Sequence, residues 1–94
     1  MIQWTEQAIR QLDHAQDYIT LSNSDKVATR IIEHIVNSVQ QLVMFPISGR
    51  PGRVPGTREL VISGTPFLVA YAVEKHRIVV LAIYHGAQQW PETF

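Results

Sequence analysis

The stretch from Gly56 to Trp90 most constrains what this chain can fold into, because it contains almost all of the strand-forming residues of the sequence. From Thr65 to Tyr84 apolar and β-branched residues run nearly unbroken, and a run so rich in Val, Ile, Phe and Tyr favours strands over a helix. The polar residues 74–77 interrupt this run and predict the turn of a hairpin, and a second break at residues 63–66 separates an earlier strand. We therefore predict three consecutive antiparallel strands, over residues 57–62, 66–73 and 77–84.

The residues before Gly56 predict two amphipathic helices. Thr5 can cap the first, whose apolar stripe repeats every three or four residues up to about Leu21. The residues Ser22, Asn23 and Ser24 then predict both a turn and the cap of the second helix. The second keeps a 3.6-residue period from Asp25 to Met44 and cannot continue through Pro46. Because the connection between them is short, we expect the two helices to form an antiparallel hairpin.

The order of these elements predicts the fold class. Residues 1–4 are expected to form a short first strand that joins the sheet, so the chain runs strand, helix, helix and three-stranded meander. We predict a single α+β domain over residues 1–94, with the helical hairpin on one face of a three- to four-stranded, mainly antiparallel sheet. The opposite face should be concave, bordered by Arg58, His85 and the loop of residues 46–56.

Composition narrows the class of partner. The formal net charge is zero, whereas a protein that grips a nucleic-acid backbone usually carries a positive excess. There is no cysteine for disulfide or thiolate chemistry, and no apolar run reaches the roughly 20 residues needed to span a bilayer. Because no signal peptide is visible at the N-terminus, we expect a cytoplasmic protein with no membrane contact.

The chain resembles the RelE/ParE superfamily of bacterial toxins from type II toxin–antitoxin modules. The resemblance covers nearly the whole chain and is carried by Trp4, the helical hairpin and four segments. These segments are LVMFPISGRPG (42–52), TREL (57–60), FLVAY (67–71) and IVVLAIYHGAQQWP (78–91). It implies the RelE/ParE-like fold and a cognate antitoxin that wraps and silences the toxin. DNA would be reached only indirectly, through the antitoxin complex, and neither cofactor nor metal is expected.

The superfamily has two main activities, between which fold cannot choose. RelE-like members cut messenger RNA on the ribosome, whereas ParE-like members poison DNA gyrase. The neutral charge, Gln88 where many relatives have arginine, and the lack of a tyrosine after Gln88 all favour the ParE-like activity. We predict a gyrase-directed toxin without its own catalysis. The alternatives are a ribosome-dependent endoribonuclease and a degenerate toxin kept for regulation.

The nuclease alternative assigns catalysis to Arg58 and His85. Arg58 would clamp a phosphate and His85 would transfer a proton, in line with the positions of such residues in RelE-like relatives. The structural alternatives are a salt bridge from Arg58 to Glu59 or Glu33, and a His85 that only bonds the C-terminal tail. Tyr84 is not expected to share a site with His85, because neighbouring strand residues face opposite ways.

The gyrase prediction assigns target binding to Arg50, Arg53, Arg58 and Gln88. It assigns antitoxin binding to Trp90 and Phe94, whose alternative role is to seal the open end of the core. Arg50 and Arg53 could equally be solvated loop residues. The remaining histidines, which have no metal-ligand spacing, are His14, His34 and His76.

Overall fold

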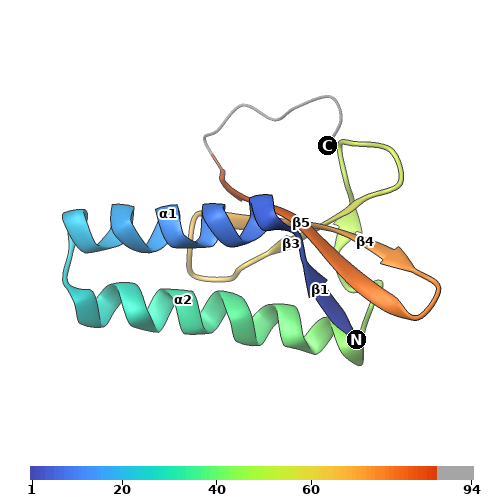
Figure 1. The fold of residues 1–94 in the computed structure, drawn as a ribbon, viewed down its shortest axis with the longest axis horizontal. Coiled ribbons are helices and arrows are strands. Elements are labelled where there is room, and N and C mark those ends of the chain that lie inside the picture. The colour runs from blue at the N-terminus through green and yellow to red at the C-terminus, as the bar shows by residue number, and fades with distance from the viewer. Residues whose placement is uncertain (87–94) are drawn as a thin grey trace.

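The computed structural model describes residues 1–86, which form two helices packed on a mixed sheet (Figure 1). The elements are β1 (Ile2–Trp4), α1 (Glu6–Ser22), α2 (Asp25–Gln40), a 3₁₀ turn (Gln41–Val43), β2 (Arg50–Pro51), β3 (Arg58–Val61), β4 (Phe67–Glu74) and β5 (Arg77–His85). The predicted α+β class and the order of helical hairpin and meander are confirmed. None of the described helices is long and apolar enough to cross a membrane.

Within residues 1–86 the strands form one five-stranded sheet in the order β1-β5-β4-β3-β2. Neighbouring strands are antiparallel except β1, which runs parallel to β5. The prediction of a three- to four-stranded sheet is one strand short. Arg50 and Pro51, which lie in the predicted loop, form a strand that pairs with Glu59 and Arg58 of β3. A two-residue strand that contains proline has no alternating pattern from which it could be predicted.

Both helices begin at the predicted caps. The Thr5 side chain accepts a hydrogen bond from the Ala8 N–H, and the Ser24 side chain accepts one from the Val27 N–H. The second helix ends four residues before the predicted Met44, because residues 41–43 tighten into a 3₁₀ turn ahead of Pro46. In Figure 1 the two helices lie antiparallel, with their connecting turn far from the strands.

Helix α1 covers the edge of β5 that β1 leaves unpaired. Strand β1 pairs only with residues 78–80 of β5. At the end of this pairing the Thr5 N–H donates to the Val80 carbonyl at 3.0 Å, and the Thr5 hydroxyl donates to the Leu81 carbonyl at 3.1 Å. The Ile83 N–H then donates to Gln11 Oε1 at 2.8 Å. Thr5, which caps α1, and the Gln11 side chain of α1 therefore satisfy backbone groups that would otherwise invite pairing with another chain.

The two faces of the sheet carry different sets of side chains. The face under the helices carries the main core, and its largest buried members include Ile35, Leu42 and Tyr71. The opposite face carries a smaller cluster of Ala70, Ala82 and Tyr84. A bulge between Ala70 and Tyr71 shifts the register, so the alternation along β5 changes phase within the strand.

The register corrects one expectation about the site. Arg58 pairs with Tyr71, and His85 pairs with Phe67, so both residues lie on the face that the helices cover. They do not border the opposite, predicted concave face. The alternation of the sequence showed which residues share a face, but it did not show which face the helices cover.

The fully buried Tyr71 anchors the loop that follows the 3₁₀ turn. Its hydroxyl donates to the Pro46 carbonyl at 2.9 Å and accepts from the Gly49 N–H at 2.9 Å. Gly49 is needed there, because a Cβ at this position would lie 2.6 Å from the Tyr71 hydroxyl oxygen and 2.9 Å from the Glu59 carbonyl oxygen. One phenol therefore fixes the path of the loop on both sides of Ile47.

We predict that Tyr71→Phe lowers the free energy of unfolding by about 2 kcal/mol, because it leaves the part-buried Pro46 carbonyl and the buried Gly49 N–H without their partner. The matched control is Tyr18→Phe, since Tyr18 is 60% exposed; this change should cost less than about 0.5 kcal/mol. Urea unfolding of both variants measures the difference. Equal effects of the two changes would contradict the anchoring role of Tyr71.

Candidate target-binding surface

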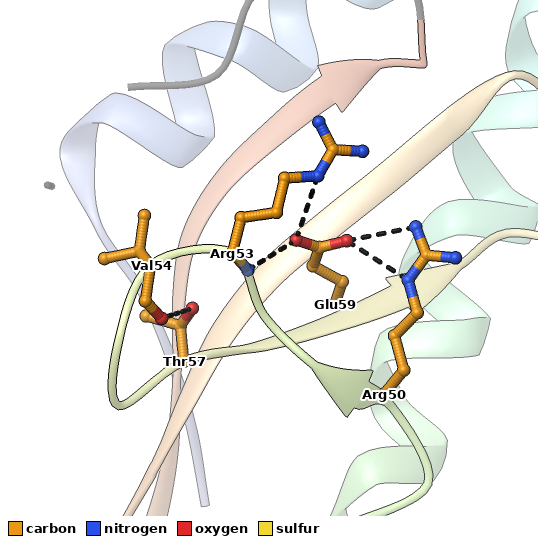
Figure 2. A network of polar contacts seen from close by, with 5 residues as sticks. All are labelled: Arg50, Arg53, Val54, Thr57 and Glu59. Atoms are coloured by element: carbon orange, nitrogen blue, oxygen red, sulfur yellow. Dashed lines mark hydrogen bonds and ion pairs between the residues drawn. The ribbon is translucent and has the colours of Figure 1, made fainter. Parts of the chain in front are cut away.

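A buried carboxylate organises the arginines of the loop. Glu59 lies in β3 and is only 2% exposed. Its Oε1 accepts hydrogen bonds from Arg50 Nε at 3.2 Å and Arg50 Nη2 at 3.0 Å (Figure 2). Its Oε2 accepts from the backbone N–H of Arg53 at 2.9 Å and forms an ion pair with Arg53 Nε at 3.5 Å. A carboxylate removed from water in this way requires such partners.

Arg50 and Arg53 have one side paired and one side in solvent. Their side chains are 54% and 50% exposed although both contact Glu59. The alternative of simply solvated loop residues is therefore wrong. Two guanidinium groups and one carboxylate leave one net positive charge, so the cluster can still attract an acidic partner.

Glu59 brings these arginines together, and this role was not predicted from the sequence. The available signal was the alternation in TREL, which places Glu59 and Arg58 on opposite faces of the strand. What the sequence could not supply was the pairing of Arg50 with Glu59 across β2 and β3.

Arg58 has a different environment from the other two arginines. Its Nη1 donates to the Gly49 carbonyl at 2.8 Å and to the Ile47 carbonyl at 3.4 Å. The alternative of a salt bridge to Glu59 or Glu33 is therefore wrong, since Glu59 points to the other face and is held by Arg50 and Arg53. Arg58 instead holds the same loop that Tyr71 anchors.

His85 ends β5 among aromatic rings. Its ring meets the rings of Phe67 and Tyr18 edge to face, with centroids 5.8 and 6.4 Å apart. These rings line a cavity of about 430 Å³ between α1 and the ends of β4 and β5. Its described lining is Gln11, His14, Ala15, Tyr18, Phe67, Ile83 and His85. This lining contains neither a carboxylate nor a Lys or Arg, so it offers no fixed charge to a phosphate.

The two residues of the nuclease alternative lie at opposite ends of the sheet. Arg58 pairs with Tyr71, which pairs with Val80, five residues before His85 on β5. At about 3.3 Å per residue the backbones of Arg58 and His85 are about 15 Å apart along the strand direction. Arg58 does not line the cavity beside His85, and its guanidinium is bonded to loop carbonyls, so the structure does not present the two side chains to one site.

Tyr84 faces away from His85, as predicted, and joins the cluster on the opposite face. Burial raises the pKa of Tyr84 above its usual value of 10.0, and hydrogen bonds to the side chains of Gln11 and Gln7 partly offset this rise. Tyr84 therefore stays protonated at neutral pH and acts there as a neutral hydrogen-bonding group.

Some predicted residues lie outside the described part of the chain. Gln88, Trp90 and Phe94 belong to residues 87–94, so their predicted roles stay predictions. Among residues 1–86, no three His, Cys, Asp or Glu side chains gather in a way that could hold a metal ion. His34 bonds the Ser63 carbonyl at 2.9 Å, a contact between α2 and the turn before β4.

Comparison with known proteins identifies the family. Residues 2–90 match the family model described as the ParE toxin of the type II toxin–antitoxin system parDE. The chain belongs to the ParE toxin family. A protein of Sinorhizobium fredii, Y4kP, which is described as a candidate toxin, is 38% identical over 91 residues, covering 97% of this chain and 93% of the relative.

A solved structure supports the same assignment. The chromosomal ParDE toxin–antitoxin system from P. aeruginosa contains a chain that is 30% identical and superposes with a TM-score of 0.82. The match covers 89% of this ParE-family chain and 92% of that chain. The protein is thus the toxin of a ParDE-type system, and such a system implies an antitoxin as partner.

We predict that Glu59→Gln lowers the free energy of unfolding of this toxin by about 2 kcal/mol, because Arg50 and Arg53 lose the buried carboxylate that holds them. The loss is limited to this size because both guanidinium groups are half exposed and can be hydrated by solvent instead. Glu74→Gln is the matched control, since Glu74 forms an exposed ion pair with Arg77 at 2.8 Å; it should cost less than about 1 kcal/mol. Urea unfolding checks both changes. A Glu59→Gln protein as stable as the wild type would show that the cluster does not organise the loop.

We also predict an alkaline loss of stability from Tyr84. Because its pKa is raised in the folded state, its contribution is complete below pH 10.0 and disappears as the pH rises through the folded pKa. The stability difference between the wild type and Tyr84→Phe should be constant between about pH 8 and 9 and should shift in favour of the variant above about pH 10. Urea unfolding across this range measures it, and a pH-independent difference would contradict the prediction.

Proposed function

We propose that this toxin inhibits growth by binding DNA gyrase in the cytoplasm and blocking replication, and that it has no chemistry of its own. In this mechanism the toxin stabilises a gyrase state in which the DNA is broken. Its cognate antitoxin prevents this by covering the toxin. Membership of the ParE family supports this reading, because gyrase is the expected target of ParE-like members.

The observation that carries the proposal is the separation of Arg58 from His85. Cleavage of RNA by attack of its 2′-hydroxyl requires a proton-transferring group and a cation at the same phosphate. The two candidates lie about 15 Å apart along the sheet, and Arg58 is bonded to two loop carbonyls. The zero net charge also favours a protein target over a ribosomal one.

The contacts that we propose for gyrase are Arg50, Arg53 and Arg58, together with Gln88. Arg50 and Arg53 present half-exposed guanidinium groups beside Glu59, and a planar guanidinium suits a carboxylate on a protein surface. Trp90 and Phe94 are the proposed antitoxin contacts.

The test is supercoiling by purified gyrase with the toxin titrated in, with cleaved DNA scored separately. We expect inhibition with accumulated cleaved complexes. The variant Arg50→Gln, Arg53→Gln, Glu59→Gln removes the cluster without leaving a buried charge unpaired, and it should weaken inhibition about tenfold. The control is Glu6→Gln, Arg10→Gln, Arg30→Gln, which makes the same net charge change on the helices and should shift inhibition less than about twofold.

A folded toxin that blocks growth but leaves gyrase unaffected would overturn the proposal. Messenger RNA cleavage on ribosomes that is lost in both Arg58→Lys and His85→Gln would instead establish the nuclease alternative. Normal growth without antitoxin would leave only the regulatory, degenerate alternative.

A further inference from the structure

Three large apolar side chains are exposed together in the segment that follows the 3₁₀ turn. Met44 is 75% exposed, Phe45 62% and Ile47 69%. Single exposed apolar residues are common on protein surfaces, but a contiguous group suggests an interaction site. We call residues 44–47 the apolar loop. It lies at the far end of α2 from the turn between the helices (Figure 1).

Hydrogen bonds hold the apolar loop in place from both ends. The N–H groups of Met44 and Phe45 donate to the Gln41 carbonyl at 3.1 and 2.9 Å, and the Ser48 N–H donates to the Phe45 carbonyl at 3.1 Å. The Tyr71 hydroxyl and Arg58 bind the carbonyls of Pro46 and Ile47. The backbone of the loop is therefore held in one preformed arrangement, which reduces the entropy lost on binding.

Positive charge borders the apolar loop. Arg58 lies against it, and Lys75 lines a cavity of about 180 Å³ that Val43 and Pro46 also line. The Glu74 carboxylate in this lining is paired with Arg77 at 2.8 Å. Among the described residues no carboxylate pairs with Lys75.

Negative charge is scarce in this part of the chain. The sequence has no acidic residue between Glu33 and Glu59, and Glu59 is buried against Arg50 and Arg53. A partner surface that complements the apolar loop would be apolar and bordered by carboxylates. Binding would then bury apolar area on both sides and pair opposite charges.

We propose that the apolar loop is an anchor that inserts into an acidic, apolar surface of the gyrase that this toxin binds; the proposal rests on the function proposed above. A toxin acts on its target only when it is free of antitoxin, so its target-binding surface must be formed in the chain alone. The apolar loop meets this condition, since contacts within the chain hold it. The arginines beside Glu59 would supply orientation, and the apolar loop would supply most of the binding energy.

The test compares exposed apolar residues at the two ends of the helical hairpin. The variant Met44→Ser, Phe45→Ser, Ile47→Ser should weaken gyrase inhibition and binding to immobilised gyrase by more than about tenfold. Phe45→Ser alone should weaken both by about fivefold, whereas Leu21→Ser, which removes an 88% exposed side chain at the end of α1, should leave both within about twofold. Lys75→Glu should weaken binding most at low salt. All variants should bind the antitoxin as the wild type does, which also shows that they are folded.

Each other outcome overturns the proposal. If the wild type inhibits gyrase and the triple variant inhibits it equally, the apolar loop is not the anchor although the proposed function stands. A wild type without effect on gyrase overturns the proposed function and this contact together. The apolar loop has a partner other than gyrase if the triple variant loses only one other kind of binding. That partner would be the antitoxin, a second copy of this chain (self-association in sedimentation) or a phosphatidylglycerol membrane (vesicle binding). Equal losses in Leu21→Ser and Phe45→Ser would show an unspecific effect of apolar surface.

Discussion

The hydrogen bonds of one buried hydroxyl determine how this chain presents its irregular segment. Tyr71 lies in the central strand β4, under the helices, and it contacts the carbonyl before Ile47 and the N–H of Gly49. Because these groups are buried with it, the loop cannot move without leaving polar atoms unsatisfied. Both the apolar loop and the start of β2 depend on this anchor, so the core of the sheet controls the surface that we propose for binding.

Glu59 performs the equivalent task on the opposite face of the sheet. Its carboxylate is removed from water and is compensated by two arginines from the same loop. Such a cluster adds little net stability when compared with apolar packing, but it specifies one arrangement of the charges. The loop is thus tied to the sheet by Tyr71 and Arg58 on one face and by Glu59 on the other. This double attachment explains how a segment rich in proline and glycine can be an ordered surface.

The same sheet is the basis on which we propose binding rather than catalysis for this toxin. Arg58 begins β3 and His85 ends β5, and strands β3 and β5 run in the same direction on either side of β4. The start of one strand and the end of another that runs the same way lie at opposite ends of the sheet, so Arg58 and His85 are held apart. Each has instead a local structural environment, loop carbonyls for Arg58 and aromatic rings for His85.

Caps, periodicity and polar breaks are local properties of the chain, and they predicted both helices and every strand except β2. Thr5, Ser24 and the polar break at residues 74–77 marked the ends of helices and strands, and the α+β class followed from their order. Tertiary structure alone decided which groups meet. The pairing of Arg50 with Glu59, the bulge after Ala70 and the face that the helices cover each depend on contacts between distant residues. No local pattern encodes such contacts, which is why Glu59 and the Tyr71 anchor appeared only in the folded chain.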